Sequence, residues 1–435
     1  MTPVTVIGAG LAGCECAWQL AGRGIPVRLI EMKPQKMSPA HVSENFAELV
    51  CSNSLRSDEL TNAVGLLKEE LRRLDSVVLA SADHNRVAAG GALAVDREAF
   101  ACEITERICA HPNITVERAE ATAIPEGEVV IATGPLTSDA MAEEIQRLCP
   151  EFDLHFYDAV APIVTLESVD MDSAFFASRY DKGTADYVNC PMDQAEYTAF
   201  VQELRTAKEA PVHGFDDGAV FEGCMPVEVM ARRGEDTLRY GPLKPVGLRD
   251  PRTGKDNYAV VQLRRDNAEG TLYNIVGFQT HLTFGEQKRV FSMIPALREA
   301  EFVRYGVMHR NTFLESPSVL TKQQFLKEHP NVFFAGQITG FEGYMESAAS
   351  GLLAAHQILA RLQGRELPPP PANTMCGALL DYITTPNKDF QPMGANMGIL
   401  PRIEEINAIR DKRERYAALS QNAQDAMQAW VEENK

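Results

Sequence analysis

The distribution of apolar residues at the start of the chain predicts a strand, a helix and a second strand. The apolar run VTVI covers residues 4–7, and the glycine-rich sequence GAGLAG follows directly at 8–13. The next segment has helical length and ends near Gly22, and a second apolar run covers 26–31. A strand, a glycine turn, a helix and another strand in this order are typical of a βαβ unit.

The glycine turn and the carboxylate after the second strand are the candidate binding residues. Gly8 permits a tight turn, Gly10 lets a pyrophosphate approach the backbone, and Gly13 lets the helix pack close to the strand. The N-terminus of the helix offers N–H groups and a positive dipole end to phosphates. Glu31 can accept hydrogen bonds from a ribose. The pattern predicts an adenine-dinucleotide site, and the alternative is a degenerate turn with a purely structural role.

Two later segments have the pattern of strands that end in glycine turns. The run at 128–131 leads into Ala132-Thr133-Gly134, and the run at 331–335 leads into Gly336-Gln337. A helical pattern then covers about 344–362. These segments predict that the chain returns to its first domain near residue 330.

Between these parts the pattern changes to short strand-like segments separated by turns. Segments 258–263 and 271–278 predict a hairpin through a turn at 267–270, and 193–207 predicts a helix. A chain of 435 residues is also longer than one core usually supports. We therefore predict a first domain at 1–151, an inserted α+β substrate domain at 152–305, a return segment of the first domain at 306–366, and a proline-rich linker with C-terminal helices at 367–435.

Composition and charge exclude several classes of protein. The 45% apolar and 23% charged content is ordinary for a soluble protein, and no apolar run is long enough to span a membrane. The N-terminal residues lack a signal-peptide pattern. The net charge of −18 argues against non-specific nucleic-acid binding. A basic stretch at 232–265 is the exception, and it is either a solvated face or a phosphate-contacting patch.

The nine cysteines show neither CxxC nor zinc-ligand spacing, which predicts thiols in a reducing cytoplasm. Five of them lie in apolar helical contexts and are predicted to be core residues: Cys14, Cys16, Cys102, Cys109 and Cys149. Cys51 precedes small polar residues, and Arg56 stands where a C-x4-C redox pair would place its second cysteine. Cys51 is therefore either a buried structural thiol or a functional one. Cys224 lies in a Gly-Cys-x-Pro turn, which predicts a loop position, where catalytic residues are common.

Several longer motifs together carry a resemblance to a known family. These are GAGLAG with Glu31, LVCSNSLRSD, FEGCMPVEVMA, GPLKPVGL and FFAGQITGFEGYMESAASGL. They resemble the bacterial folate- and FAD-dependent tRNA uracil-5-methyltransferases along essentially the whole chain. The chain is similar, more loosely, to a larger tRNA carboxymethylaminomethyl-uridine flavoprotein. The resemblance implies an α/β fold with a glutathione-reductase-type FAD-binding Rossmann domain and an inserted α+β domain.

The resemblance also implies an activity and a set of site residues. A one-carbon unit passes from 5,10-methylenetetrahydrofolate to C5 of uridine 54 in the tRNA T-loop, FADH2 supplies the reduction, and NAD(P)H reduces the flavin. The implied catalytic residues are Cys51 and Cys224. The residues expected to bind the cofactor are Gly8, Ala9, Gly10, Leu11, Ala12, Gly13, Glu31, Thr133, Gly134, Gly336 and Gln337. Many glutathione-reductase-type flavoproteins have Gly-Asp where this chain has Gly336-Gln337, which puts the ribitol contact in question.

The chemistry of uracil fits two thiols. A thiolate that adds to C6 makes C5 nucleophilic, and the C5 proton must then be removed. We assign Cys224 to the addition and Cys51 to proton removal or methylene handling, and the reverse assignment stays open. Two other hypotheses remain: an FAD-dependent thiol or small-molecule oxidoreductase, and a non-catalytic flavoprotein partner in a tRNA-modifying complex. The sequence predicts no metal site and leaves the oligomeric state open.

Overall fold

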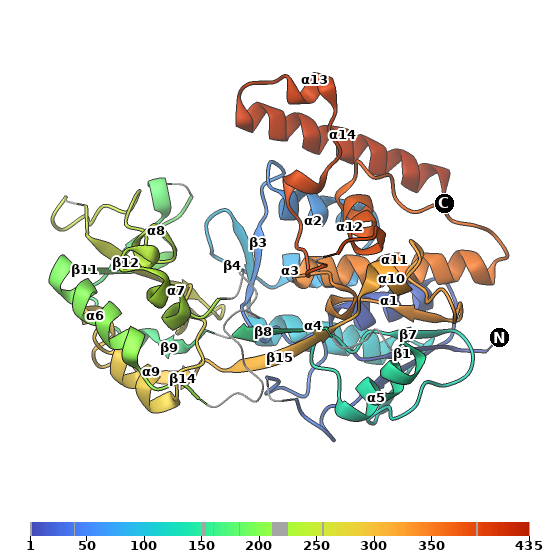
Figure 1. Cartoon of the computed structure of the whole chain (residues 1–435), viewed down its shortest axis with the longest axis horizontal. Helices are drawn as coiled ribbons and strands as arrows, with labels where there is room; N and C mark the ends of the chain where they lie inside the picture. The colour runs from blue at the N-terminus through green and yellow to red at the C-terminus, as the bar shows by residue number, and fades with distance from the viewer. Residues whose placement is uncertain are drawn as a thin grey trace.

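The computed structural model describes residues 2–38, 40–149, 154–159, 161–181, 183–210, 225–254, 256–388 and 390–434. The described chain forms two lobes, and a pair of C-terminal helices lies along one side (Figure 1). None of its helices is both long and apolar enough to cross a membrane. Cys224 lies outside the described residues.

A parallel sheet forms the centre of the larger lobe. Its strands, in spatial order, are β16 (Val332–Phe334), β7 (Val129–Ile131), β1 (Val4–Ile7), β2 (Val27–Glu31) and β6 (Ile114–Arg118). Strands β16, β7, β1 and β2 contribute apolar residues to the cores on both faces of the sheet, which helices cover. The strand at 332–334, far along the chain, therefore pairs in the same sheet as the N-terminal strand, and the predicted return to the first domain is confirmed.

Helices α1 (Leu11–Gly22) and α11 (Tyr344–Leu362) pack together on one face of this sheet. A Cβ at Gly351 would lie 2.0 Å from the Ala12 carbonyl oxygen, so the crossing requires a glycine. Helix α5 (Asp139–Leu148) covers the opposite face through Met141 and Ile145. The two helices α1 and α11 thus bring the two glycine turns of the sequence to one edge of the sheet.

The smaller lobe is built on an antiparallel sheet with its own hydrophobic core. Its strands, in spatial order, are β10 (Phe175–Ala177), β11 (Tyr187–Met192), β12 (Ala259–Arg265), β13 (Leu272–Ile275), β9 (Ile163–Thr165) and β14 (Phe302–Arg304). The helices of this lobe are α6 (Gln194–Thr206), α7 (Val227–Arg233), α8 (Thr237–Tyr240) and α9 (Phe284–Phe291). Strands β12 and β13 pair antiparallel with Leu263 opposite Ile275, which confirms the predicted hairpin.

A two-stranded ribbon runs between the lobes. Strand β8 (Leu154–Ala159) leads into the smaller lobe, and β15 (Met308–Phe313) pairs with it antiparallel on the way back (Figure 1). The remaining elements of the larger lobe are β3 (Ser54–Ser57), β4 (Arg86–Val87), β5 (Ala92–Val95), α2 (Ala63–Arg73), α3 (Val77–His84), α4 (Arg97–Ala110) and α10 (Ser316–Val319). The domain limits drawn from the sequence at 151, 305 and 366 remain a prediction.

Two sequence-based expectations are wrong in detail. The sequence predicts one charged helix over about 402–434, but the structure has two helices, because α13 (Glu404–Asn407) ends and α14 (Lys412–Glu433) begins with Asp411 as its N-cap. Of the five cysteines expected in the core, Cys102 is half-buried and Cys109 is exposed. Both lie on α4, whose core face consists instead of Phe100, Ala101, Ile104 and Ile108.

Helix α12 (Met375–Thr384) depends on a buried carboxylate of α2. The Glu70 side chain is fully buried and accepts hydrogen bonds from the backbone N–H groups of Met375 (2.7 Å) and Cys376 (2.8 Å). These N–H groups belong to the first helical turn, which has no intrahelical acceptors. Burial raises the pKa of Glu70 to about 7, against the hydrogen bonds that lower it.

The raised pKa of Glu70 makes stability depend on pH. The folded state binds this proton more tightly than the unfolded state, so the free energy of unfolding falls as pH rises from about 4.5 to about 7. Relative to Glu70→Gln, the wild type should lose about 3 kcal/mol between pH 4.5 and 8, measured by urea unfolding. Replacement of the exposed Glu106 by glutamine should preserve the wild-type pH dependence. Parallel pH curves for wild type and Glu70→Gln would contradict the assignment.

Candidate active site

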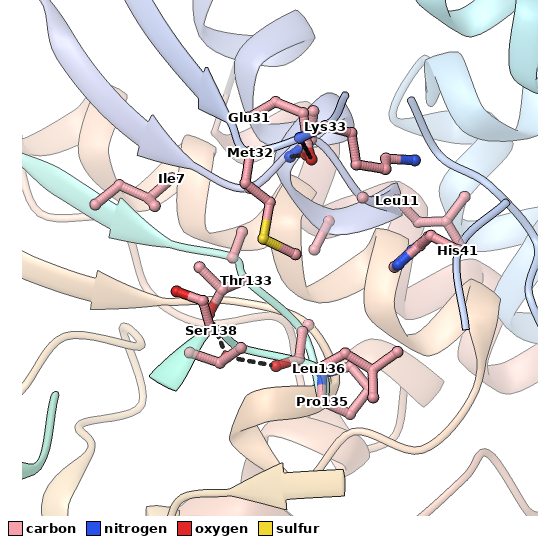
Figure 2. A pocket seen from close by; sticks show the side chains of 18 of the residues that line it. Ile7, Leu11, Glu31, Met32, Lys33, His41, Thr133, Pro135, Leu136 and Ser138 are labelled. Carbon is pink, nitrogen blue, oxygen red and sulfur yellow. Dashed lines mark hydrogen bonds between the residues drawn. The ribbon is translucent and has the colours of Figure 1, made fainter. Parts of the chain in front are cut away.

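A cavity opens at the carboxyl ends of the parallel strands, between the two glycine turns (Figure 2). It collects residues from β1, β2, β7 and the segment after β16, together with the first residues of α11. The sequence-predicted binding residues that line it are Gly8, Ala9, Gly10, Leu11, Ala12, Glu31, Thr133, Gly134, Gly336 and Gln337. Gly13 is not part of the lining and lies against the backbone of Gly8.

Each of the three glycines in the first turn is explained by a different feature of its surroundings. Gly8 has a φ of +98°, and a Cβ there would lie 2.5 Å from the Ala132 carbonyl oxygen. A Cβ at Gly13 would lie 1.8 Å from the Gly8 carbonyl oxygen. Gly10, by contrast, has no heavy atom within 4 Å of a built Cβ. Gly8 and Gly13 are therefore required by the fold, whereas Gly10 leaves open space at the N-terminus of α1, where a phosphate group can approach the backbone.

Glu31 fixes the end of β2 to the glycine turn. Its carboxylate is 6% exposed and accepts hydrogen bonds from the N–H groups of Ala9 (2.7 Å) and Lys33 (2.9 Å). Each carboxylate oxygen can accept a second hydrogen bond. Glu31 can therefore bind a ribose hydroxyl while it holds the turn in shape, and the second of these roles was not anticipated from the sequence.

A wall of the cavity comes from the loop after β2, which contains no recognisable motif. Lys33 and Glu48 form a buried ion pair with an N–O distance of 3.4 Å, and Glu48 also accepts hydrogen bonds from the N–H groups of Val42 and Ser43. His41 of this loop points toward the cavity, as does Met32 from the end of β2 (Figure 2). Burial and the nearby Lys33 lower the pKa of His41, so its imidazole is neutral at physiological pH.

The second glycine turn is shaped to fit against the first helix. Gly336 has a φ of +85°, and a Cβ there would lie 3.0 Å from the Ala12 Cβ. The Gly336 N–H donates to the Ser350 hydroxyl (3.0 Å), and the Gln337 side-chain amide donates to Glu342 (3.1 Å). Gln337 thus lines the cavity with its amide already hydrogen-bonded.

Cys51 lies on a loop at the border of this cavity. The backbone N–H groups of Cys51 and Ser52 both donate to the hydroxyl of Tyr344, at 2.8 and 3.2 Å. Tyr344 and Val50 line the cavity, and Cys51 itself is half-buried. Burial raises the pKa of Tyr344, so its hydroxyl stays protonated. The first residue of α11 thereby positions the backbone of the thiol loop.

The same loop is connected to the smaller lobe by two arginines, Arg97, which is half-buried, and Arg264, which is buried. Arg97 donates to the Leu49 carbonyl oxygen (2.5 Å) and pairs with Asp266 (2.8 Å). Arg264 of β12 donates to the Ser52 hydroxyl (2.6 Å). The loop is therefore fixed from the larger lobe and from the antiparallel sheet at the same time. Sequence reasoning missed both arginines, because neither belongs to a short motif.

Several arginines of the basic stretch at 232–265 form ion pairs. Acidic partners within the described chain accompany four of its arginines: Arg232 with Glu209, Arg239 with Asp236, Arg249 with Asp256, and Arg252 with Asp250. Arg264 is buried. Three of these acids belong to the stretch itself and only Glu209 lies outside it, so the choice between a solvated face and a phosphate-contacting patch stays a prediction.

Replacing Arg97 with methionine tests the connection between the lobes. Asp266 would keep a buried carboxylate without its cation, so we expect a loss of about 3 kcal/mol in the free energy of unfolding. Arg28→Met is the matched control, because Arg28 and Glu117 form a half-exposed pair whose loss costs about 0.5 kcal/mol. Urea unfolding of both variants measures the difference. Equal losses would show that the Arg97 pair contributes no more than a surface pair.

Comparison with known proteins agrees with this architecture. The family model described as Glucose inhibited division protein A matches residues 3–366. The solved structure of Aquifex aeolicus GidA aligns with a TM-score of 0.68 at 15% identity, covering 99% of this chain and 76% of that one, which shows the shared fold.

Relatives with much higher identity carry one name, Methylenetetrahydrofolate--tRNA-(uracil-5-)-methyltransferase TrmFO. The relative from Desulforamulus reducens is 58% identical over 434 residues, covering 99% of this chain and 98% of the relative. The relative from Lactiplantibacillus plantarum is 56% identical over 421 residues, covering 97% and 95%. With this identity along nearly the whole length, and with a cavity formed by the glycine turns of both halves, the chain belongs to the Glucose inhibited division protein A family, in the group whose members are named TrmFO.

Proposed function

We propose that this protein transfers a one-carbon unit from 5,10-methylenetetrahydrofolate to C5 of a tRNA uridine and reduces it to the methyl group of 5-methyluridine. The observation that carries the proposal is the identity of 55–58% to relatives named for this reaction, over at least 97% of the chain. The acceptor is uridine 54 of the T-loop, and NAD(P)H is the reductant. The activity belongs to the cytoplasm, where tRNA and folate occur together.

FAD fits the cavity as the resident cofactor. The open space at Gly10 and the N-terminus of α1 suit the pyrophosphate, and Glu31 suits the adenosine ribose. The second turn, at Gly336 and Gln337, lies beside the start of α11, where the helix dipole favours negative charge. When bound, FAD supplies the electrons that convert the transferred carbon to a methyl group.

The protein's own contribution to the chemistry is two thiols and their placement. The thiolate of Cys224 adds to C6 of uracil, so that C5 gains the electron density to attack the one-carbon unit. Cys51 assists removal of the C5 proton. Support for placing Cys51 near the reaction comes from its loop, which Tyr344 holds at the rim of the cavity and Arg264 joins to the antiparallel sheet.

The test is nucleoside mass spectrometry on an unmodified tRNA transcript. The transcript is incubated anaerobically with the protein, FAD, NADPH and 5,10-methylenetetrahydrofolate, and a parallel reaction lacks the folate. 5-Methyluridine at position 54, over several turnovers and only with folate, is the expected result. A protein that holds FAD and oxidises NADPH without forming this product would contradict the proposal.

A further inference from the structure

A second cavity lies at the far ends of helices α1 and α11. Both helices begin at the cavity between the glycine turns, and the wall of the second cavity includes Arg23, just after α1, and Arg365, just after α11. About 18 Å of helix separates Leu11, in the first cavity, from Arg23. The second cavity has a volume of about 380 Å³, which is in the range of sites for small molecules. It is therefore a separate site and not an extension of the first.

Three guanidinium groups line this second cavity, those of Arg23, Arg73 and Arg365. Arg73 pairs with Glu69 at an N–O distance of 3.4 Å. Among the described residues, neither Arg23 nor Arg365 has a carboxylate within ion-pair distance, and their side chains bond to neutral groups instead. The acidic side chain in the described wall is Asp75. The wall therefore carries a net positive charge.

The ends of four helices explain part of this arrangement. Helices α1, α2, α11 and α14 all end at the cavity, and the carbonyl groups at a helix C-terminus attract cations. Arg23 makes such a contact, because its Nη1 donates to the Gln19 carbonyl oxygen (3.1 Å). The side chain of Arg365 donates from Nε to Gln363 (2.8 Å). A guanidinium has five N–H donors, so Arg365 keeps donors that no described residue accepts.

The protonation state of His356, in the same wall, reflects the positive charge of the cavity. Its Nε2 is 3.3 Å from the Arg23 Nη2. Because a guanidinium only donates, Nε2 accepts this hydrogen bond and the imidazole is neutral. Burial, followed by the charges of Arg23 and Arg365, lowers the pKa of His356 to about 3. The imidazole therefore leaves the cations of the wall without a counter-charge.

The rest of the wall is apolar and includes an indole ring. Leu74, Leu359 and Leu367 line the cavity together with Trp430. The Trp430 Nε1 donates to the Pro368 carbonyl oxygen (3.0 Å), so the polar edge of the indole already has its partner. The ring thus offers a ligand an apolar surface. Cations and an apolar wall in one cavity suit a molecule that has both an anionic group and an apolar part.

We propose that this cavity binds a small organic molecule through a phosphate group, with Arg23 and Arg365 at the phosphate and Trp430 beside the apolar part. Guanidinium groups bind phosphate oxygens in a bidentate manner. Two of them match a phosphate monoester, whose charge is about −2 at neutral pH, better than a single carboxylate. The backbone of tRNA is a second source of phosphate. A free molecule fits the position better, because the cavity assigned to the reacting uridine lies at the opposite ends of α1 and α11.

The experiment follows the fluorescence of Trp430 in the full-length, FAD-loaded protein. The chain has two tryptophans, so Trp18→Phe leaves Trp430 as the reporter. The probes are inorganic phosphate, phenyl phosphate and phenol, in a chloride buffer of low ionic strength. Both phosphate compounds should give a saturable change, and phenyl phosphate should have the lower Kd because its ring contacts the apolar wall. Phenol should give no saturable change.

Substitutions decide whether the arginines of the wall form the site. Arg23→Gln and Arg365→Gln should each raise the Kd for phenyl phosphate at least tenfold, because each removes a cation from the wall. Arg402→Gln removes the same charge from an exposed position outside the described wall, and it should leave the Kd unchanged. Both arginines of the wall are exposed, so their replacement leaves the hydrophobic core intact.

The outcomes are independent of methyl transfer, so failure of the proposed function would leave this inference standing. The absence of a saturable change with both phosphate compounds overturns it. An unchanged Kd in Arg23→Gln and Arg365→Gln also overturns it, because the anion would then bind elsewhere. Equal Kd values for phenol and phenyl phosphate overturn the assignment of an anion. Displacement of phenyl phosphate by an unmodified tRNA transcript supports the phosphate site but overturns its assignment to a free molecule.

Discussion

Replacing Gly10 with valine should remove FAD from the protein and leave its fold intact. Gly10 is the N-cap of α1 with an extended backbone, φ −73° and ψ −170°, which valine adopts without strain. No protein atom lies within 4 Å of a Cβ at this position, so the side chain would extend into the open space assigned to the pyrophosphate. We expect the purified variant to lack flavin absorbance and to bind added FAD at least a hundredfold more weakly.

Gly13→Val is the matched variant with the opposite expectation. Its Cβ would lie 1.8 Å from a backbone oxygen of Gly8, so α1 would have to move away from the turn. Thermal unfolding of the apoproteins should show a lowered Tm for Gly13→Val and a nearly unchanged Tm for Gly10→Val. Normal flavin content in Gly10→Val would mean that the cofactor does not approach this turn.

Cys224→Ala should abolish formation of 5-methyluridine, because no other group in the proposed mechanism can add to C6. We expect the rate of 5-methyluridine formation to fall at least a thousandfold, because the covalent activation of uracil is absent rather than slowed. Cys51→Ala removes a thiol assigned to the later proton step. A variant with this change should still form a covalent bond between the Cys224 sulfur and C6 of a 5-fluorouridine in the RNA. Nucleoside mass spectrometry measures the methylated product, and a denaturing gel measures the covalent protein–RNA complex. The two measurements together distinguish the roles of the two thiols.

The control for both thiols is the exposed Cys109, whose replacement by alanine should leave activity unchanged. The opposite result for the pair, a complex in Cys224→Ala and none in Cys51→Ala, would reverse the assignment of nucleophile and assisting thiol. FAD content should remain normal in Cys51→Ala and Cys109→Ala, because neither of these two side chains lines the cavity.

The local elements of the site could be predicted from the sequence because their causes are local. Gly8 needs a positive φ and Gly13 needs a close approach, and both requirements appear as a short motif with fixed spacing. Helix α11 was predicted at its observed limits, since apolar periodicity and the flanking turns mark it.

The contacts that hold the site together could not be predicted, because their partners are far apart in the chain. Arg97 meets Asp266, Cys51 meets Tyr344, and Glu70 meets the start of α12. No periodicity links such residues, and their pairing follows only from the packing of complete elements. The pairing of Arg232, at the start of the basic stretch, with Glu209 could not be predicted for the same reason.

The position of β16 in the central sheet has a consequence for synthesis on the ribosome. This strand, at 332–334, pairs beside β7, at 129–131, and the cavity wall at Gly336, Gln337 and Tyr344 follows it. About three quarters of the polypeptide must emerge before the nascent chain can complete the cofactor cavity. The smaller lobe, whose antiparallel strands pair over shorter distances in the sequence, can form earlier. Flavin can therefore bind only late in synthesis, after the strand at 332–334 has joined the central sheet.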